Sequence, residues 1–252
     1  MKRPWIFYLF PQAVTLTGIF FGLLSIAWAP GRPYAAGIAI LLACTCDLLD
    51  GRVARWTGTE SQFGLQMDSL ADIINCGLAP AFLAYHWSLR GMMIGRFDLS
   101  LLIVFFFVAC AAIRLARFNV DVEKKVPQDK LSAKGNPAPH STFSGIPTPV
   151  AAMLICTAVM TYHETGLLFL KRAAFMGPYV LVIALLMVST IPFRSFKGFR
   201  SRFGQILFFG SILAGYATLA FGGPGGAILL CLLCIYVISG LVKKVLNLIP
   251  LS

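Results

Sequence analysis

Four aspartates between positions 47 and 72 have the spacing of side chains that share the faces of two helices. Asp47 and Asp50 are three residues apart, and Asp68 and Asp72 are four apart, so each pair lies on one helical face. The whole protein has only ten acidic residues, and these four lie within or beside strongly apolar sequence. A carboxylate at membrane depth costs about 2.5–3.5 kcal/mol on insertion, and such residues usually mark function.

This concentration of carboxylates predicts a bound cation, because opposite charge offsets the cost of removing the acids from water. All-oxygen ligation suits Mg²⁺, Mn²⁺ or Ca²⁺ better than Zn²⁺. Gly51 and Ala54 have almost no side chain and leave room for a bulky group beside the acids. Arg55 can pair with a phosphate. The alternative is a set of ion pairs with Arg52 and Arg55, but the four acids outnumber these arginines.

The complete spacing resembles the signature of the CDP-alcohol phosphatidyltransferases, and it departs from that signature at none of its defining positions. In this chain the signature reads Asp47-x2-Asp50-Gly51-x2-Ala54-Arg55-x8-Gly64-x3-Asp68-x3-Asp72. The resemblance implies an integral membrane enzyme that transfers a phosphatidyl group from a CDP-linked lipid to an alcohol. Such an enzyme uses divalent metal and releases CMP.

The resemblance also implies roles for individual residues. It implies two metal ions, Mg²⁺ or Mn²⁺ with Ca²⁺ as a further candidate, and it makes Asp72 the catalytic base. The metal ligands would be Asp47, Asp50, Asp68 and Asp72. The residues that bind the CDP-lipid would be Gly51, Ala54, Arg55 and Gly64.

Three further stretches, 112–119, 143–152 and 192–197, are similar to the phosphatidylserine synthase branch of this family. That similarity implies CDP-diacylglycerol and L-serine as substrates, with phosphatidylserine and CMP as products. Serine carries a carboxylate that an arginine can bind through two hydrogen bonds. The expected acceptor-binding residues are Arg114, Arg117, Thr142 and Ser144. Glycerol 3-phosphate and an inositol phosphate remain alternative acceptors, since the basic loops offer charge for a phosphate as well.

The composition predicts the class of fold that positions these residues. The chain is 58% hydrophobic and 12% charged, with a mean hydropathy of +0.80, whereas soluble domains carry about 25% charged residues. We therefore expect an all-α integral membrane protein, a polytopic bundle of about eight transmembrane helices that forms one domain over 1–252. A short interfacial segment is expected at 1–11, followed by motif-bearing helices at about 34–87 and accessory helices at about 99–247. The expected spans are about 13–28, 34–56, 65–87, 99–118, 147–165, 175–192, 203–221 and 227–245.

Several local features accompany these spans. The polar stretch 55–66 predicts a loop between the two acidic pairs, and Pro80 predicts a kink in the third span. The longest polar stretch is 120–145, and we expect 142–147 to act as a substrate loop. Gly18-x3-Gly22 favours close helix contact, either within the bundle or between two copies of the chain.

The basic residues predict the orientation in the membrane. All but five of the 21 lysines and arginines fall at the termini or in the loops after the second, fourth and sixth expected spans. The positive-inside rule therefore makes the acid-bearing face cytoplasmic. It also explains the net charge of +11 through lipid headgroups, without nucleic acid as a partner. The five exceptions are Arg32, Arg90, Arg96, Lys171 and Arg172.

We expect a multi-pass protein of the plasma membrane, most simply in a prokaryote, without a cleavable signal peptide. The family resemblance implies a homodimer among membrane lipids. Two other classes of protein predict different patterns. A transporter with buried acids predicts acids near the bilayer middle on broken or repeated helices, and a catalytically inactive scaffold predicts the loss of a motif acid. The clustered and complete motif favours the enzyme over both.

Overall fold

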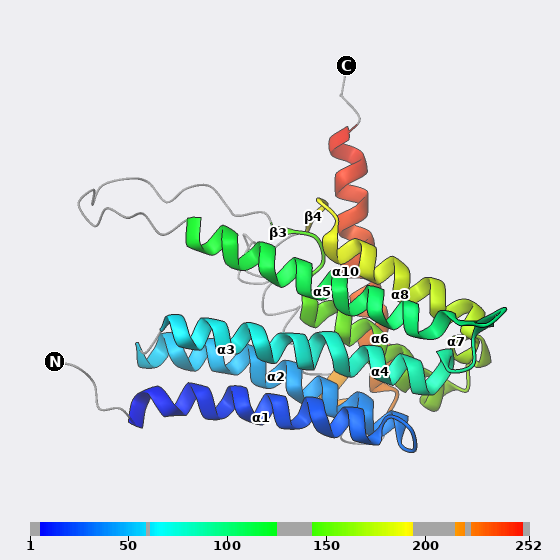
Figure 1. Cartoon of the computed structure of the whole chain (residues 1–252), viewed down its shortest axis with the longest axis horizontal. Helices are drawn as coiled ribbons and strands as arrows, with labels where there is room; N and C mark the ends of the chain where they lie inside the picture. The colour runs from blue at the N-terminus through cyan, green and yellow to red at the C-terminus, as the bar shows by residue number, and fades with distance from the viewer. Residues whose placement is uncertain (1–5, 59–60, 125–142, 194–214, 220–222, 249–252) are drawn as a thin grey trace.

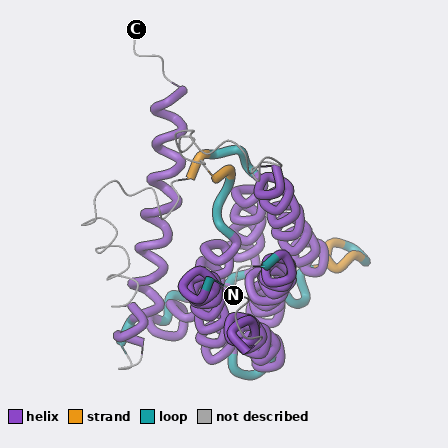
Figure 2. Tube along the Cα trace, turned by 90° about the vertical axis from the view of Figure 1, so that its left-hand side faces the viewer, coloured by secondary structure: helices purple, strands orange, loops and turns teal. Residues whose placement is uncertain are grey.

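The protein is a bundle of helices, seen here in a computed structural model that describes residues 6–58, 61–124, 143–193, 215–219 and 223–248 (Figure 1). The first two helices and the helical rod that follows them lie side by side with nearly parallel axes (Figures 1 and 2). The helices and strands, with the π-helical turns labelled η, are α1 (Ile6–Trp28), α2 (Pro33–Thr57), α3 (Gln62–Asp72), η1 (Ile73–Leu78), α4 (Ala79–Ala84), η2 (Tyr85–Leu89), β1 (Met93–Ile94), β2 (Phe97–Asp98), α5 (Leu99–Lys124), β3 (Phe143–Ser144), α6 (Thr148–Thr165), α7 (Leu168–Lys171), α8 (Ala173–Val188), β4 (Pro192–Phe193) and α10 (Gly225–Leu248).

The connection between the two acidic pairs is shorter than the sequence predicted. The expected loop at 55–66 is wrong at both ends, because α2 continues to Thr57 and α3 begins at Gln62. Gly58 has a φ of 62°, a left-handed conformation that glycine adopts readily at the end of a helix. Ser61 then caps α3, since its hydroxyl oxygen accepts a hydrogen bond of 3.0 Å from the backbone N–H of Gly64. The connection between α2 and α3 is therefore only a few residues long.

The expected third span is a continuous helical rod that alternates between α and π geometry. It runs through α3, η1, α4 and η2, and so from Gln62 to Leu89. Pro80 falls in the first turn of α4, where its missing N–H removes little, and η1 directly precedes it. A π turn shifts the hydrogen-bond pattern from i−4 to i−5, as the bond from Ala79 N to Ile74 O shows. One π turn directly precedes α4, which carries Pro80, and a second follows it; the expected kink stays a prediction.

The sequence predicted a separate interfacial element at 1–11, but the described part of this segment belongs to α1. Residues 6–11 form the first turns of α1, and Pro11 lies inside this helix. The apolar residues before Pro11 continue the same helix, whereas residues 1–5 lie outside the described part of the chain. Helix α1 is therefore long enough to place its N-terminal half beside the acidic residues of α2.

Helix α6 is the centre of the bundle. Every side chain from Val150 to Thr161 is buried, which is the pattern of a helix that is covered on all sides. It packs against α2, α4, α8 and α10. Gly166 ends it in the left-handed conformation, with a φ of 70°. The hydroxyls of Thr157 and Thr161 donate to carbonyls of the preceding turn at 2.6 Å and 2.7 Å, so they add no unpaired polar group to the core.

The second half of the chain closes over this centre. Helices α5 and α8 pack together, and α10 leans against α6 with its C-terminal end extending past the bundle (Figure 1). Strand β1 pairs with β2 ahead of α5. Strand β3 pairs antiparallel with β4, with Phe143 opposite Phe193 and Ser144 opposite Pro192. This pairing joins the N-terminal end of α6 to the C-terminal end of α8, although the two are far apart in sequence.

The length and composition of the helices indicate an integral membrane protein. Among the described residues, four helices are long and apolar enough to cross a bilayer, at Phe10–Trp28, Pro33–Ala54, Leu99–Val120 and Gly225–Val242. They correspond to four of the expected spans. The spans expected at 65–87, 147–165 and 175–192 fall on the rod, α6 and α8, and most of the one expected at 203–221 lies outside the described residues. The total of eight spans stays a prediction.

Candidate active site at the acidic cluster

The structure brings three of the four motif acids into one cluster. Asp47 and Asp50 project from α2, and Asp68 projects from the second turn of α3. One carboxylate oxygen from each of the three lies within 4.8 Å of the other two. Asp50 is only 5% exposed, so its charge is largely removed from water. Three carboxylates held this close repel one another strongly unless a cation lies among them.

Asp72 lies one helical turn deeper than Asp68 and occupies a different environment. Its carboxyl is within hydrogen-bonding range of Asp47, but it does not belong to the three-residue cluster. The Cys76 thiol points at Asp72 Oδ1 across 3.8 Å. The charge of Arg114 on α5 also acts on Asp72. Asp72 thus lies close to the cluster and within electrostatic range of the buried Arg114.

Helix α1 contributes a residue that the sequence motif does not contain. The Thr15 hydroxyl donates a 2.6 Å hydrogen bond to Asp50 Oδ2, and both residues are buried. This bond leaves the second oxygen of Asp50 for another partner. The sequence signal was one of the few polar residues of a mostly apolar helix, but nothing in the spacing connected Thr15 to an aspartate 35 positions later.

The residues that were predicted to bind the CDP-lipid lie on both sides of the helix connection. Gly51 and Ala54 are half-buried on α2 beside the acids, where their small size leaves the backbone accessible. Gly64 has a clear structural duty, because its N–H completes the cap of α3. Arg55 is part of α2, but its side chain lies outside what the structure describes.

The side chains of the two predicted acceptor arginines on α5 contact the N-terminal end of α6 and the C-terminal end of α8. Arg114 is 8% exposed, and one of its terminal nitrogens donates to Thr148 Oγ1 at 3.3 Å. Its Nε is buried without a hydrogen-bond partner among the described residues. Arg117 donates to the backbone carbonyl of Val188 at 3.1 Å. The structure therefore unites the N-terminal end of α6 and the C-terminal end of α8 around these arginines.

The other two predicted acceptor residues are less defined. Ser144 lies in β3, although its side chain is not described, and Thr142 lies outside the described residues. The adjoining backbone is held firmly: Gly145 N donates to Ile191 O at 2.9 Å, and Ile146 N donates to Leu186 O at 3.1 Å. Gly145 has a φ of 84°, and a Cβ there would collide with the carbonyl of Met187. The expected substrate loop is thus anchored at its C-terminal end.

A second contact that sequence reasoning missed joins α3 to α5. Asn119 Nδ2 donates to Ser69 Oγ at 2.9 Å, next to Asp68. The Ser69 hydroxyl lies 3.1 Å from the carbonyl of Leu65, to which it donates. This contact places the end of α5, with its arginines, beside the helix that carries Asp68 and Asp72.

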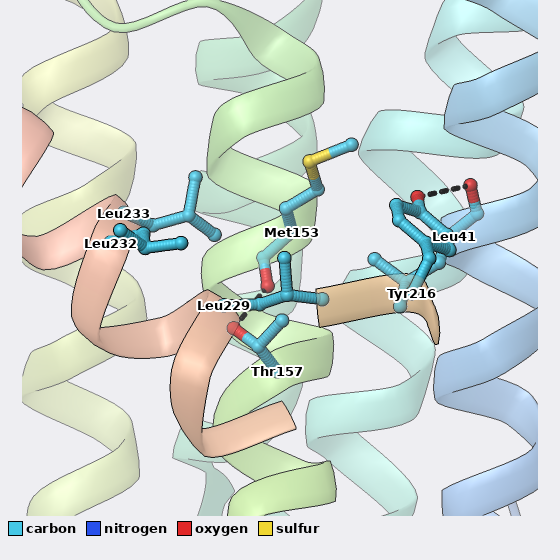
Figure 3. A pocket seen from close by; sticks show the side chains of 7 residues that line it. All are labelled: Leu41, Met153, Thr157, Tyr216, Leu229, Leu232 and Leu233. Atoms are coloured by element: carbon cyan, nitrogen blue, oxygen red, sulfur yellow. Dashed lines mark hydrogen bonds between the residues drawn. The ribbon is translucent and has the colours of Figure 1, made fainter. Parts of the chain in front are cut away.

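A separate apolar pocket lies deeper in the bundle (Figure 3). Tyr216 donates to the carbonyl of Leu41 at 3.1 Å across this pocket, and Thr157 donates to the carbonyl of Met153. Its lining contains no carboxylate and no basic group, so it offers nothing for a metal or a phosphate. The lining residues are Leu41, Met153, Thr157, Tyr216, Leu229, Leu232 and Leu233.

The donor set of the acidic cluster fits a hard divalent cation. Carboxylate oxygens from two helices are the ligands that Mg²⁺, Mn²⁺ and Ca²⁺ prefer, and no thiol or imidazole belongs to the three-residue cluster. A polar site at the edge of an apolar bundle, with a buried arginine nearby, suits a substrate that carries both phosphates and lipid chains.

Comparisons with known proteins agree with this chemistry. The sequence model of the CDP-alcohol phosphatidyltransferase family matches residues 8–193. A CDP-diacylglycerol–serine O-phosphatidyltransferase of Helicobacter pylori is 35% identical over 191 residues, which cover 75% of this chain and 73% of that protein. The protein of that name from Methanocaldococcus jannaschii is 32% identical over 238 residues, 92% of each chain.

A third relative of that name, from Saccharomyces cerevisiae, is 37% identical over 142 residues, which cover 55% of this chain and 47% of its own length. The family match extends over most of the chain and contains the acidic cluster, Thr15 and both acceptor arginines. The protein belongs to the CDP-alcohol phosphatidyltransferase family.

Proposed function

We propose that this protein transfers the phosphatidyl group of CDP-diacylglycerol to the hydroxyl of L-serine, which gives phosphatidylserine and CMP. The observation that carries the proposal is the three-carboxylate cluster with Asp72 beside it, at the position where the family signature requires it. The relatives that share most of the chain are named for the serine reaction, which favours serine as the acceptor.

In this proposal Asp47, Asp50 and Asp68 are the main metal ligands, and Asp72 either shares a metal or stays free as the base. We infer two ions, Mg²⁺ or Mn²⁺. When bound, the metal supplies positive charge that neutralises the phosphate oxygens of the CDP-lipid. Gly51, Ala54, Gly64 and Arg55 form the side of the site that receives the nucleotide.

The reaction needs a base, because the pKa of a free alcohol is far above neutral pH. The serine oxygen attacks the phosphorus that stays with diacylglycerol, and the bond from that phosphorus to the CMP oxygen breaks. Asp72 accepts the proton of the serine hydroxyl, and CMP leaves with the electron pair of the broken bond. Because Asp72 lies deeper than Asp68 and beside Asp47, it can act on an acceptor that approaches the cluster from the α5 side.

Arg114 and Arg117 are the proposed partners of the serine carboxylate, together with Ser144 and Thr142. Arg114 supports this role best, since it is buried, acts electrostatically on Asp72 and has an Nε without a described partner. A cation held next to the base favours an anionic acceptor. The same charge suits a phosphate, so glycerol 3-phosphate and an inositol phosphate are the acceptors to compare with serine.

We further propose that the chain is one membrane domain of about eight spans that acts as a homodimer. The acidic face is proposed to be cytoplasmic, in the plasma membrane of a prokaryote. The distribution of basic residues supports this orientation, and it gives the site access to soluble serine and lets CMP leave into water.

The test is an acceptor panel on purified protein in detergent, with CDP-diacylglycerol and Mg²⁺ or Mn²⁺ present. Each alcohol is supplied alone, and CMP release is measured. We expect release with serine, its loss with EDTA and a reduction of about 100-fold or more in Asp72→Asn, as is typical for removal of a general base. Release with glycerol 3-phosphate or an inositol phosphate but not with serine would contradict the acceptor. Full activity after metal removal would contradict the metal role.

A further inference from the structure

Asn75 is a buried amide in the π turn that follows Asp72. It lies in η1, is 2% exposed, and its Oδ1 has no hydrogen-bond partner among the described residues. Burying an amide oxygen without a partner is unfavourable, so such groups in native proteins call for an explanation. Neither the family signature nor the chemistry proposed above uses Asn75.

The side chain of Asn75 occupies a notch between two glycines of α1. A Cβ on Gly22 would collide with Asn75 Oδ1, and a Cβ on Gly18 would lie 3.2 Å from Asn75 Nδ2 and 3.3 Å from the Cβ of Cys46. Gly18 and Gly22 are buried on the same face of α1. The Gly-x3-Gly pattern therefore serves contact within the chain, where it admits a polar side chain from the rod and lies against α2.

This notch is close to the acids along both helices. Asn75 follows Asp72 by three residues, and η1 begins directly after Asp72. A π turn changes the angle between the residues before it and the residues after it. Asp68 and Asp72 directly precede η1, so a contact that fixes the rotation of the rod at η1 also sets the direction in which these two acids point. Helix α1 also contacts the other acidic pair, through the 2.6 Å bond from Thr15 to Asp50. One helix thus contacts both Asp50 and the π turn that directly follows Asp72.

We propose that Asn75 is a positioning residue for the metal site. Seated between Gly18 and Gly22, it fixes the rotation of the rod against α1 and so keeps Asp68 and Asp72 facing the acids of α2. The inference rests on the proposed metal role of the acidic cluster. A shift of the rod would move ligands from one helix relative to those of the other, which weakens metal binding before it affects recognition of serine.

The experiment compares three variants with the wild type. Gly22→Ala places a methyl group on Asn75 Oδ1, Asn75→Ala empties the notch, and the double variant removes the collision while it keeps the methyl group. Gly177→Ala on α8 is the matched control, because that buried glycine has room for a methyl group, with Ile103 nearest at 3.4 Å. Mn²⁺ binding to the purified protein without substrate, the Mn²⁺ concentration for half-maximal CMP release, the KM for serine and the melting temperature are measured.

We expect Gly22→Ala to weaken Mn²⁺ binding about tenfold, within the range found when groups that orient metal ligands are changed. The KM for serine at saturating Mn²⁺ stays near the wild-type value. Asn75→Ala weakens Mn²⁺ binding in the same direction without lowering the melting temperature, since it also removes an unpartnered amide. The double variant binds Mn²⁺ more tightly than Gly22→Ala does, and Gly177→Ala behaves like the wild type.

Two results would overturn the inference. One is wild-type Mn²⁺ binding in both Gly22→Ala and Asn75→Ala, and the other is a lower melting temperature with unchanged Mn²⁺ binding, which would assign Asn75 to packing alone. If Gly22→Ala does not fold, Asn75→Ala decides the question, because it introduces no collision. Asp68→Asn separates this test from the proposed function: if Asp68→Asn and the wild type bind Mn²⁺ equally, the metal role itself has failed.

Discussion

Thr15→Val offers the sharpest test of how the acidic cluster is held. The substitution keeps the shape of the side chain and removes the hydroxyl that donates to Asp50 Oδ2 at 2.6 Å. Thr15 is 7% exposed and Asp50 is 5% exposed, so water does not easily replace the lost donor. A hydrogen bond to a charged group contributes about 1.5–3 kcal/mol. The bond orients Asp50 for a metal that it would hold, and the loss of such a contact to a metal ligand typically weakens metal binding by about 10- to 100-fold.

The assay for Thr15→Val is CMP release as a function of Mn²⁺ concentration, with CDP-diacylglycerol and serine near saturation. We expect the half-saturating Mn²⁺ concentration to rise by about tenfold or more, with most of the activity regained at high Mn²⁺. Thr15→Ser should behave like the wild type, because it keeps the donor. Thr17→Val is the matched control, since Thr17 is an exposed threonine of the same helix whose hydroxyl donates to the carbonyl of Ala13.

Equal half-saturation in Thr15→Val and Thr17→Val would refute this reasoning. It would mean that the hydrogen bond to Asp50 neither orients the carboxylate nor compensates its charge when metal is present. A loss of maximal activity that high Mn²⁺ does not restore would also count against it, because it would place the effect of Thr15 on substrate and not on metal.

Three further predictions follow from single contacts. Arg114→Lys should raise the KM for serine by about tenfold or more, because lysine cannot replace a buried guanidinium that donates to Thr148 and faces the acceptor side. An unchanged KM in steady-state kinetics would exclude Arg114 from acceptor binding. Gly145→Ala should lower stability by about 1–3 kcal/mol, since its φ of 84° is strained for alanine and a Cβ meets the carbonyl of Met187; a thermal melt equal to the wild type would contradict the geometry. Glu164→Gln should lower the melting temperature, because the Glu164 carboxylate accepts hydrogen bonds of 2.9 Å and 3.0 Å from the first N–H groups of α10. The KM for serine should stay unchanged, since Glu164 is far in sequence from the acids, and a changed KM would contradict this separation from the site.

Hydropathy was a good guide to the helices and a poor guide to where they end. The apolar runs predicted the positions of α1, α2, α5, α6, α8 and α10, although only α1, α2, α5 and α10 are long and apolar enough to cross a bilayer among the described helices. The loop at 55–66 was predicted from its polarity and from Gly58 and Gly64, yet α2 and α3 both extend into it, with Gly58 in the left-handed conformation and Ser61 as the cap of α3. Polarity reports exposure to water, and the two ends of these helices are both polar and helical.

The acidic cluster was predictable, whereas its supports were not. The i,i+3 and i,i+4 spacing fixes which acids share a helical face, and one family signature is enough to bring two faces together. The hydrogen bond from Thr15 and the contact between Asn119 and Ser69 join residues far apart in the chain. Such contacts depend on how the helices rotate and slide against each other, and no periodicity in a single sequence encodes that. The two π turns of the rod were not predicted from the sequence either.

The Gly-x3-Gly pattern in α1 shows how one sequence signal can support two different structures. Small residues four apart permit close approach of any partner, so the pattern alone left contact between two copies of the chain open. In the structure Gly18 and Gly22 are buried by Asn75 and by α2. A homodimer must therefore use other surfaces, because seating a second helix on these glycines would expel Asn75 and turn the rod that carries Asp68. A variant in which a second copy of the chain is forced onto this face should therefore lose metal binding as it assembles.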